Sequence, residues 1–328
     1  RAGREPVRVR AGVDDVDLEW LLSRDDIIGL GESYWQSILQ NPEQVLPEFH
    51  QTLKAGKTLE GHSAGARGKK LMAYAAAGVS SCHEPITADE VLERLRLGMH
   101  VMIREGSIRA DLKPISRIKD AGIDFRRLIL ATDGVEPIDL VEKGYMTSVL
   151  QKAIDYGFPP VTAVQMATLN VAEHFGLDPH IGGVGPGRYA DLLILPDLKT
   201  IDPEYVISNG RIAVKKGQLL VEPRIHRFSE ESRNSIRIKR QMTAADFAIR
   251  LAEEARDATV RVMDMITDLV TQEARLTIPV RSGEIHADPE AGLLKAAAVD
   301  RRIHPGRTFT GLIRGFGLRK GADRKSVV

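Results

Sequence analysis

Residues 27–32, Ile-Ile-Gly-Leu-Gly-Glu, form a short apolar run that ends on a carboxylate. The arrangement recurs along the chain, where polar side chains follow β-prone runs at Gly61-His62, Cys82-His83-Glu84 and Thr132-Asp133-Gly134. Each run comes just before a loop or a helical stretch. Polar residues at the C-terminal ends of strands are typical of a (β/α) barrel, which keeps its chemistry at that end.

Two imidazoles and two carboxylates would converge at this end of the sheet: His62, His83, Glu32 and Asp133. Nitrogen and oxygen ligands of these kinds suit a divalent metal ion with a hydrolytic role. The pattern therefore predicts a metal site, with metal-activated water attacking an electrophilic carbon.

Strand-like and helix-like stretches alternate from residue 27 to about residue 175. The predicted strands are 27–32, 58–62, 79–83, 99–103 and 128–132, and the predicted helices are 41–55, 69–77, 88–97, 137–156 and 161–175. Thr87 is a plausible N-cap, and Glu90 three residues later completes a capping box. Strands that alternate with helices indicate parallel βαβ units and an α/β fold.

The pattern changes after Gly176. A turn-rich joint at 182–187 leads to a predicted strand at 190–195. A hairpin follows at 205–214, with Asn209-Gly210 as its turn. We interpret 224–239 as a polar linker or surface segment, and 244–270 as a long helix.

The composition narrows the class of protein. The 328 residues are 43% hydrophobic, which can supply a large core, and the formal net charge of +1 gives no argument for a nucleic-acid partner. No apolar run of membrane-spanning length occurs, so we expect no membrane partner. The single cysteine, Cys82, excludes an intramolecular disulfide and fits a reducing compartment, so a cytoplasmic location is expected.

Several stretches together resemble the amidohydrolase superfamily of metallo-dependent hydrolases, and within it the adenine deaminase branch. They are GLGE at 29–32, GHSAG at 61–65, CHEP at 82–85, REGS at 104–107, ATDG at 131–134, GVGPGRYADLLIL at 183–195 and GFGL at 315–318, with Lys320-Gly321 after it. The resemblance covers roughly residues 20–321.

The resemblance implies a partial TIM-type (β/α)8 metallo-hydrolase barrel with part of a small β-sandwich domain and a C-terminal α/β domain. The expected domains are the C-terminal portion of the barrel at 1–180, the small β-domain segment at 181–223 and an incomplete adenine-deaminase-type domain at 224–328. The implied reaction is hydrolytic deamination of adenine to hypoxanthine and ammonia, in purine salvage. The implied cofactor is a binuclear pair of Mn or Fe ions, with Zn as an alternative; the partner is a small purine, and a homo-oligomer is left open.

The resemblance also implies a role for each residue at the strand ends. His62 and His83 would bind the second metal ion, and Glu32 would bridge the two ions. Asp133 would bind the first ion and take a proton from water, as a general base.

Glu84 would protonate a ring nitrogen of the substrate while water attacks the carbon that bears the amine, by analogy with the zinc nucleobase deaminases. Pro85 lets His83 and Glu84 share a pocket, because it ends the strand between them. Arg104, Glu105 and Ser107 could bind a purine edge, and a salt-bridged structural pair is an equal alternative.

One departure from the superfamily keeps other functions open. None of the nine histidines forms the His-x-His pair that supplies the first metal ion in the superfamily. We therefore expect a fragment that lacks the N-terminal part, and an in-frame His-x-His upstream of Arg1 in the gene would support this. The alternatives are another cyclic amidohydrolase that acts on a modified purine or a lactam, or a non-catalytic scaffold with the same fold.

Overall fold

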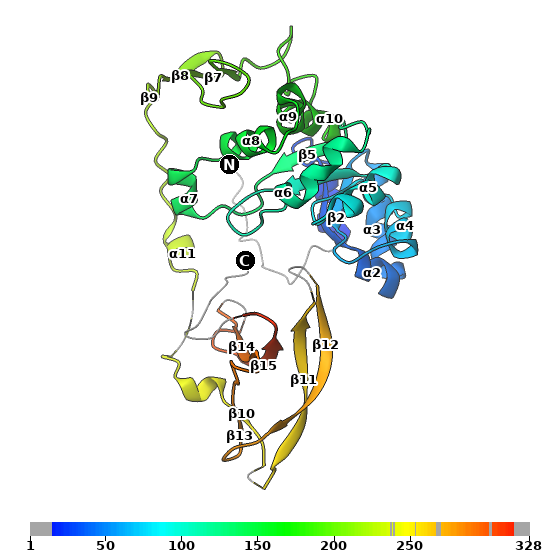
Figure 1. Ribbon diagram of the computed structural model, residues 1–328, viewed down its shortest axis with the longest axis vertical. Coiled ribbons are helices and arrows are strands. Elements are labelled where there is room, and N and C mark those ends of the chain that lie inside the picture. Colours follow the sequence, from blue (N-terminus) through cyan, green and yellow to red (C-terminus); the bar gives the residue numbers. More distant parts are fainter. Residues whose placement is uncertain are drawn as a thin grey trace. The chain divides into compact units, whose positions relative to one another are not determined.

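The computed structural model describes residues 15–317, apart from 237, 239, 253, 267–269, 302 and 303. The chain divides between Glu222 and Pro223 into two compact units, and each is described by itself (Figure 1). Within this described part, no helix has both the length and the apolar character needed to cross a membrane. Leu318, Lys320 and Gly321, which the C-terminal resemblance includes, lie outside the described residues.

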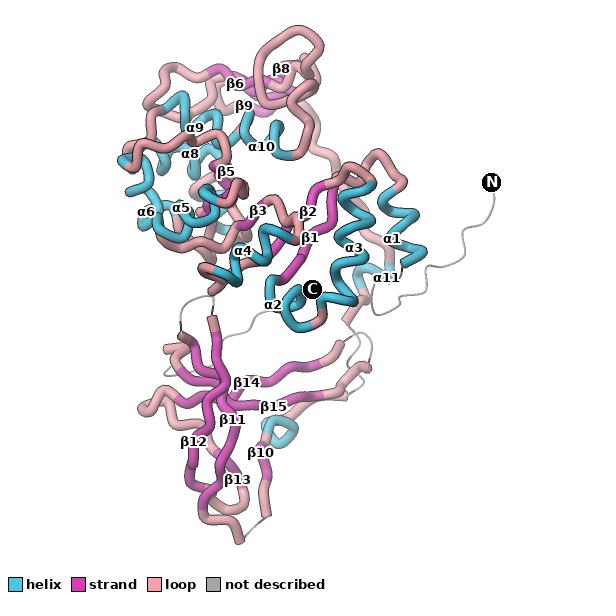
Figure 2. The backbone as a smooth tube through the Cα atoms, turned by 90° about the vertical axis from the view of Figure 1, so that its right-hand side faces the viewer, coloured by secondary structure: helices cyan, strands magenta, loops and turns pink. Residues whose placement is uncertain are grey.

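A parallel five-stranded sheet organises the first unit. Its strands lie in the order of the sequence: β1 (Gly29–Tyr34), β2 (Thr58–His62), β3 (Ser81–Cys82), β4 (His100–Arg104) and β5 (Leu128–Ala131). All four pairings are parallel, and Figure 2 shows β1 and β2 side by side. The five predicted strands are thus confirmed, and their carboxyl ends share one edge of the sheet.

The helices of this unit lie before, between and after the strands in the sequence. They are α1 (Asp15–Leu22), α2 (Trp35–Gln40), α3 (Pro42–Lys54), α4 (Lys69–Ala76), α5 (Ala88–Arg96), α6 (Leu112–Ile115), η1 (Ser116–Asp120), α7 (Pro137–Glu142), α8 (Met146–Asp155), α9 (Pro160–Ala167) and α10 (Leu169–His174). The predicted helix over 137–156 is interrupted at Gly144, whose φ is +86°. Thr87 caps α5 as predicted, because its hydroxyl accepts from the Glu90 amide.

The two faces of the sheet differ in chemistry. Leu59 of β2, Cys82 of β3 and Val101 of β4 are fully buried in the clusters that pack against the helices. Burial of a leucine-sized side chain stabilises the fold by roughly 1.5–3 kcal/mol. Because alternate residues of a strand face opposite ways, Glu60 and His62 lie on the other face of β2.

The sheet is open among the described residues. β1 and β5 each pair with one neighbour and not with each other, so this part of the chain forms a portion of a barrel. The close approach of β1 to β2 needs glycine at position 61, because an added Cβ would lie 2.2 Å from the Ser33 carbonyl oxygen.

A small antiparallel sheet completes the first unit, with β6 (Leu192–Ile194), β7 (Tyr205–Ser208), β8 (Arg211–Lys215) and β9 (Gln218–Leu219) in that order. The predicted hairpin is confirmed. Asn209 and Gly210 both have positive φ, +49° and +73°, as a type I′ turn requires.

The second unit is built mainly from strands. It contains α11 (Glu230–Arg233), η2 (Ala244–Phe247), β10 (Ile249–Arg250), β11 (Asp257–Met265), β12 (Thr271–Pro279), β13 (Glu284–Ile285), β14 (Leu293–Val299) and β15 (Thr308–Arg314). The main sheet has the order β12-β11-β15-β14, and Figure 2 shows the long β11–β12 pair. The core of this unit includes Val262, Ile285 and Leu312.

The long helix predicted over 244–270 is wrong. Among the described residues of that range, only 244–247 are helical, as one turn of 3₁₀ helix, and β11 occupies 257–265. Ala258, Val260 and Val262 are the more buried positions of β11 and alternate with exposed ones. This period of two is the pattern of a strand with one buried face, and it overrides the helical tendency of the alanines before it.

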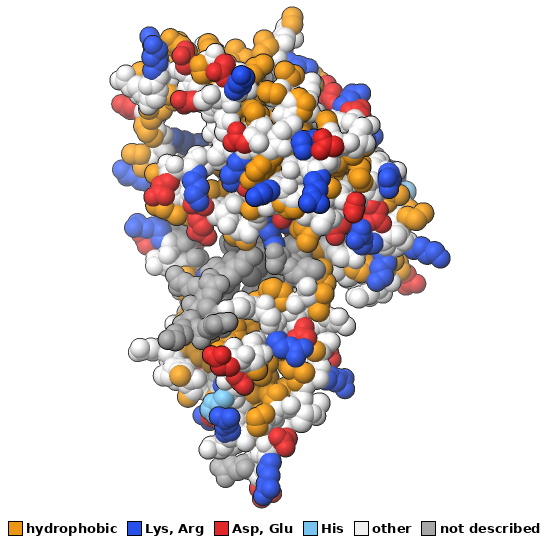
Figure 3. Space-filling view, in the orientation of Figure 1, with side chains coloured by type: hydrophobic (Ala, Val, Ile, Leu, Met, Phe, Trp, Pro, Cys, Tyr) orange, Lys and Arg blue, Asp and Glu red, His pale blue; other side chains and the backbone are white. Residues whose placement is uncertain are grey.

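Charged side chains are mixed in sign over the visible surface. Figure 3 shows lysines and arginines interspersed with aspartates and glutamates on the face that it draws. This distribution agrees with a formal net charge of only +1.

Candidate metal centre

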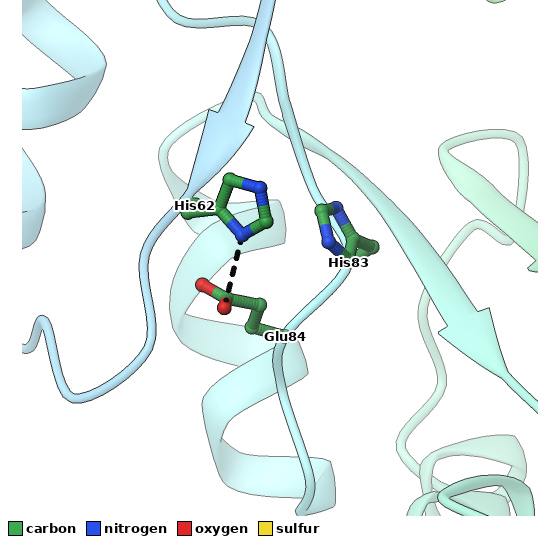
Figure 4. A group of neighbouring side chains, drawn as sticks. All are labelled: His62, His83 and Glu84. Atoms are coloured by element: carbon green, nitrogen blue, oxygen red, sulfur yellow. Dashed lines mark hydrogen bonds and ion pairs between the residues drawn. The ribbon is translucent and has the colours of Figure 1, made fainter. Parts of the chain in front are cut away.

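Two neighbouring strands bring three of the predicted residues together. His62 is the last residue of β2, and His83 and Glu84 directly follow β3. Gly61 is paired with Cys82 across the two parallel strands, so the strands end at the same level. Figure 4 shows the His62 and His83 rings and the Glu84 carboxylate turned toward one another.

The His62 ring lies between two carboxylates. Its Nδ1 is 3.1 Å from Glu84 Oε1 and its Nε2 is 3.0 Å from Glu32 Oε2. The hydrogen bond to Glu84 is the largest of the effects that raise the pKa of His62, and Glu32 adds to it against the effect of burial. In the protonated form both ring nitrogens can donate to a carboxylate.

His83 has the opposite electrostatic character. Its ring lies edge-on to that of His62, with the ring centroids 4.5 Å apart. Burial, and then the neighbouring His62, lower the pKa of His83. The imidazole is therefore neutral near neutral pH, which is the form that binds metal ions.

Glu84 is held as a carboxylate. Its Oε2 accepts a hydrogen bond from the Ala64 backbone amide at 2.6 Å, while Oε1 faces His62. Burial acts to raise the pKa of Glu84, but these hydrogen bonds and the two nearby histidines outweigh it, and the net shift is downward. The group is ionised at neutral pH.

The donor set fits a divalent metal ion. Among the described residues, His62, His83 and Glu84 each offer one ligand atom, and the three atoms lie within 4.8 Å of one another. Two imidazoles and one carboxylate form a ligand set that suits Zn, Fe or Mn. Glu84, which the sequence analysis assigned to proton transfer, is thereby also a candidate ligand.

The two other predicted ligands lie around this group rather than in it. Glu32 contacts His62, but its side chain is 75% exposed. Asp133 follows β5, and its Oδ2 accepts from Arg104 Nη1 at 3.0 Å. Glu32 and Asp133 have φ of +58° and +46°, a region that residues other than glycine seldom occupy. Such backbone strain clusters at functional sites.

The predicted substrate-binding residues contact other parts of the first unit. Arg104 is buried between Asp111 and Asp133, and its Nη2 makes no hydrogen bond. Glu105 is also buried, and it pairs with Lys152 at 2.7 Å. The Ser107 hydroxyl accepts from the Glu136 amide at 2.8 Å. A purine-binding role for Arg104, Glu105 and Ser107 stays a prediction.

Sequence reasoning missed two residues near this centre. The Tyr34 ring stacks on His62 with centroids 4.4 Å apart, and its hydroxyl donates to Glu32. Its position two residues after Glu32, on the same strand, was the available signal. Arg94 is fully buried on the apolar face of α5, one turn after Val91, and an arginine at that spacing was the second signal.

Known proteins match the chain over most of its length. Residues 43–217 match the amidohydrolase family, which is more than half of the chain. Residues 268–327 match the adenine deaminase C-terminal domain.

The relatives include the adenine deaminase of Clostridium botulinum, which is 35% identical over 97% of this chain and 53% of its own length. The adenine deaminase of Moorella thermoacetica is 37% identical over 92% of this chain and 51% of its own length. The chain thus spans about half the length of these curated relatives. The sequence resemblance to the superfamily and to its adenine deaminase branch is confirmed.

A solved structure supports the fold. The beta-aspartyl dipeptidase of Fervidobacterium islandicum AW-1 superposes with a TM-score of 0.51 at 17% identity, over 63% of each chain. At this identity the likeness concerns the fold alone. With an α/β sheet of parallel strands, histidines at the strand ends and a family match over residues 43–217, this chain belongs to the amidohydrolase family.

Proposed function

We propose that the chain carries the metal-binding part of a hydrolase that deaminates adenine to hypoxanthine and ammonia. The observation that carries the proposal is the convergence of His62, His83 and Glu84 at the carboxyl ends of β2 and β3. The substrate is inferred from relatives named adenine deaminase that are 35–37% identical. We place the reaction in purine salvage and in the cytoplasm, where the free thiol of Cys82 would stay reduced.

His62 and His83 would hold the one ion that we expect this chain to bind, with Glu84 as a candidate third ligand and Glu32 next to them. A divalent ion, when bound, acidifies water and so supplies a nucleophile near neutral pH. The donor set does not select Mn, Fe or Zn, because affinity order and availability compete. The sequence contains no His-x-His pair, so we expect at most one ion per chain.

Glu84 would move the proton. Because its carboxylate is ionised in this arrangement, it would first accept a proton from the attacking water at Oε1 or Oε2 and then pass it to a ring nitrogen or to the amino group that leaves as ammonia. Asp133 would act as a second base from the end of β5, and Arg104 would orient its carboxylate through the 3.0 Å ion pair. These roles extend the sequence-based assignment to the contacts that each side chain makes.

The test is ammonia release from adenine in the presence of Mn²⁺ or Fe²⁺. If the encoding gene continues before Arg1, the longer product is the protein to assay. We expect this chain alone to be slow, because the sheet is open among the described residues. Glu84→Gln is expected to lower kcat by about 10²–10⁴-fold, since a positioned proton-transfer group contributes that much. Glu43→Gln, at an exposed position of α3, is the matched control.

Four outcomes separate the candidates. Loss of turnover with metal retained supports proton transfer by Glu84, and loss of metal makes Glu84 a ligand instead. Turnover of a modified purine or a lactam in place of adenine would select another cyclic amidohydrolase. A protein that binds a purine and turns over none of these substrates would be a non-catalytic scaffold, and the proposal would be wrong.

A further inference from the structure

Arg94 is a buried cation that makes no ion pair with a described residue. Only 1% of its surface is exposed. Its Nε donates to Ser63 Oγ at 3.1 Å, and its Nη2 donates to the carbonyl oxygens of Ser63 at 2.8 Å and Ala66 at 3.3 Å. Its Nη1 donates to the Glu90 carbonyl oxygen on α5 at 3.1 Å. Three of these four bonds therefore tie α5 to the segment that directly follows His62.

That segment is a tight turn. The Ala66 amide donates to the Ser63 carbonyl oxygen at 3.0 Å, and Gly65 has φ of +72°. A positive φ at the third residue is the requirement of a type II turn, and glycine meets it without strain. Because the C=O and N–H of a trans peptide point opposite ways, the Ala64 amide points away from the Ser63 carbonyl oxygen and the internal hydrogen bond of the turn.

This turn also holds the Glu84 carboxylate. The Ala64 amide donates to Glu84 Oε2 at 2.6 Å, and Glu84 Oε1 faces His62 Nδ1. Trp35 Nε1 donates to the Ala64 carbonyl oxygen at 2.8 Å. Arg94 and Glu84 therefore form hydrogen bonds to opposite sides of one four-residue turn.

We propose that Arg94 is a positioning residue for the metal centre. It fixes the Ser63–Ala66 turn, so that the Ala64 amide keeps the Glu84 carboxylate aligned with His62. The inference rests on the proposed function, because only there is the orientation of Glu84 put to use.

The chemistry of the side chain explains why an arginine suits this place. A guanidinium carries five N–H donors in a planar fork, and three of its nitrogens meet separate oxygens here. A lysine ammonium would occupy one point and could not span the turn. A methionine would leave buried carbonyl oxygens without a donor, and unsatisfied buried groups are costly.

The experiment compares Arg94→Met and Arg94→Lys with Arg96→Met. Arg96 is exposed on the same helix, so it controls for the loss of charge and for the change in helix composition. The first measurement is amide hydrogen exchange of peptides covering residues 60–68 without metal. The second is Zn²⁺ affinity by competition with a chromophoric chelator.

Arg94→Met is expected to speed exchange of the turn amides by roughly tenfold or more, with α5 unchanged. It should also weaken Zn²⁺ binding by about 10–100-fold, the loss that follows removal of a group supporting a ligand. Arg94→Lys should fall between, and Arg96→Met should match the wild type in both. In Arg94→Ala, added ethylguanidinium should restore Zn²⁺ affinity whereas ethylammonium should not.

The two measurements separate failure of this inference from failure of the proposed function. If the wild-type chain binds no Zn²⁺, the proposed metal centre is wrong, and exchange alone decides whether Arg94 holds the turn. If Zn²⁺ binds equally to wild type and Arg94→Met, the positioning role is overturned. Should Arg94→Met not fold, Arg94→Lys decides, and wild-type exchange with wild-type affinity in that variant overturns the inference.

Discussion

One face of β2 carries two histidine–carboxylate pairs that lie two residues apart and differ in their surroundings. Glu60 pairs with His174 of α10, whose Nε2 is 2.9 Å from its carboxylate, and the His174 side chain is 1% exposed. His62 pairs with Glu84 and with Glu32, and the Glu32 side chain is 75% exposed. The chemistry of the pairs is the same, so their surroundings must account for the difference in role.

We call Glu60 with His174 the lower pair, and His62 with its carboxylates the upper pair. Both ring nitrogens of His62 are engaged, so what distinguishes the upper pair is its neighbour, His83. Glu60 also accepts hydrogen bonds from the hydroxyls of Ser80 and Ser81, so its oxygens are fully engaged. Next to the upper pair, His83 makes no hydrogen bond to a described residue, and its neutral ring lies beside His62. A saturated buried pair stabilises the packing of α10 on the sheet, whereas a pair with an unengaged neighbour can accept a ligand.

The largest expected effect is on metal binding. His83→Ala should weaken Zn²⁺ binding by more than about 100-fold, because it removes a ligand and not merely a supporting group. His174→Ala, assayed under conditions where it is folded, should bind Zn²⁺ as the wild type does. Competition with a chelator measures both. An equal loss in the two variants would show that the comparison between the pairs is false.

The second expected effect is on the free energy of unfolding. Here His174→Ala should have a larger effect than His83→Ala. His174→Ala leaves the partly buried Glu60 carboxylate with only its two serine donors, and loss of one partner of such a pair costs about 3 kcal/mol. His83→Ala removes no hydrogen bond and should cost clearly less. Urea unfolding followed by circular dichroism measures both changes. If His83→Ala destabilises the protein more than His174→Ala does, the lower pair is not the structural one.

The third effect is a dependence of stability on pH, which we assign to His100 next to the lower pair. Burial, and then His174 and Arg127, lower the pKa of His100 to about 4, while Glu60 acts in the other direction. Between pH 6.5 and 4 the unfolded chain therefore binds more protons than the folded one. Stability should fall by as much as about 3 kcal/mol as the pH drops through this window.

His100→Gln should remove this slope, because the amide does not titrate. Glu60 loses its stabilising charge only below its ordinary pKa of 4.5, so its contribution lies in a lower window. Unfolding measured at half-unit steps of pH would distinguish the two. A slope that survives in His100→Gln would assign it to another group.

The smallest effect should come from the exposed member of the upper pair. Glu32→Gln should change the free energy of unfolding by less than about 1 kcal/mol, because exposed ion pairs contribute little. It should weaken binding of one Zn²⁺ ion less than His83→Ala does. A loss as large as that of His83→Ala would make Glu32 a direct ligand of the first ion.

The sequence was sufficient for the elements whose pattern is local. The strand at 58–62 has the predicted bounds, and the Asn209-Gly210 turn forms the predicted hairpin. The helix over 244–270 failed because short-range composition was extended across Ala258, Val260 and Val262, whose alternation marks a strand.

Contacts between distant residues could not be predicted in this way. Glu60 and His174 are 114 residues apart, and only the packing of α10 brings them together. The hydrogen bonds from Arg94 to the turn after His62 likewise depend on where α5 lies. His62 and His83 could be placed together, because parallel strands in sequence order end at one edge.

Cys82 gives the molecule a built-in reporter. It is the chain's one cysteine, it is fully buried, and its Sγ accepts hydrogen bonds from the Ser63 hydroxyl and the Glu84 amide. A thiol reagent in solution can reach it only while the cluster that it shares with Leu59, Leu71 and Tyr74 is open. The rate of labelling therefore counts those openings directly, without an introduced probe, at a point in contact with both the turn and the centre that it supports.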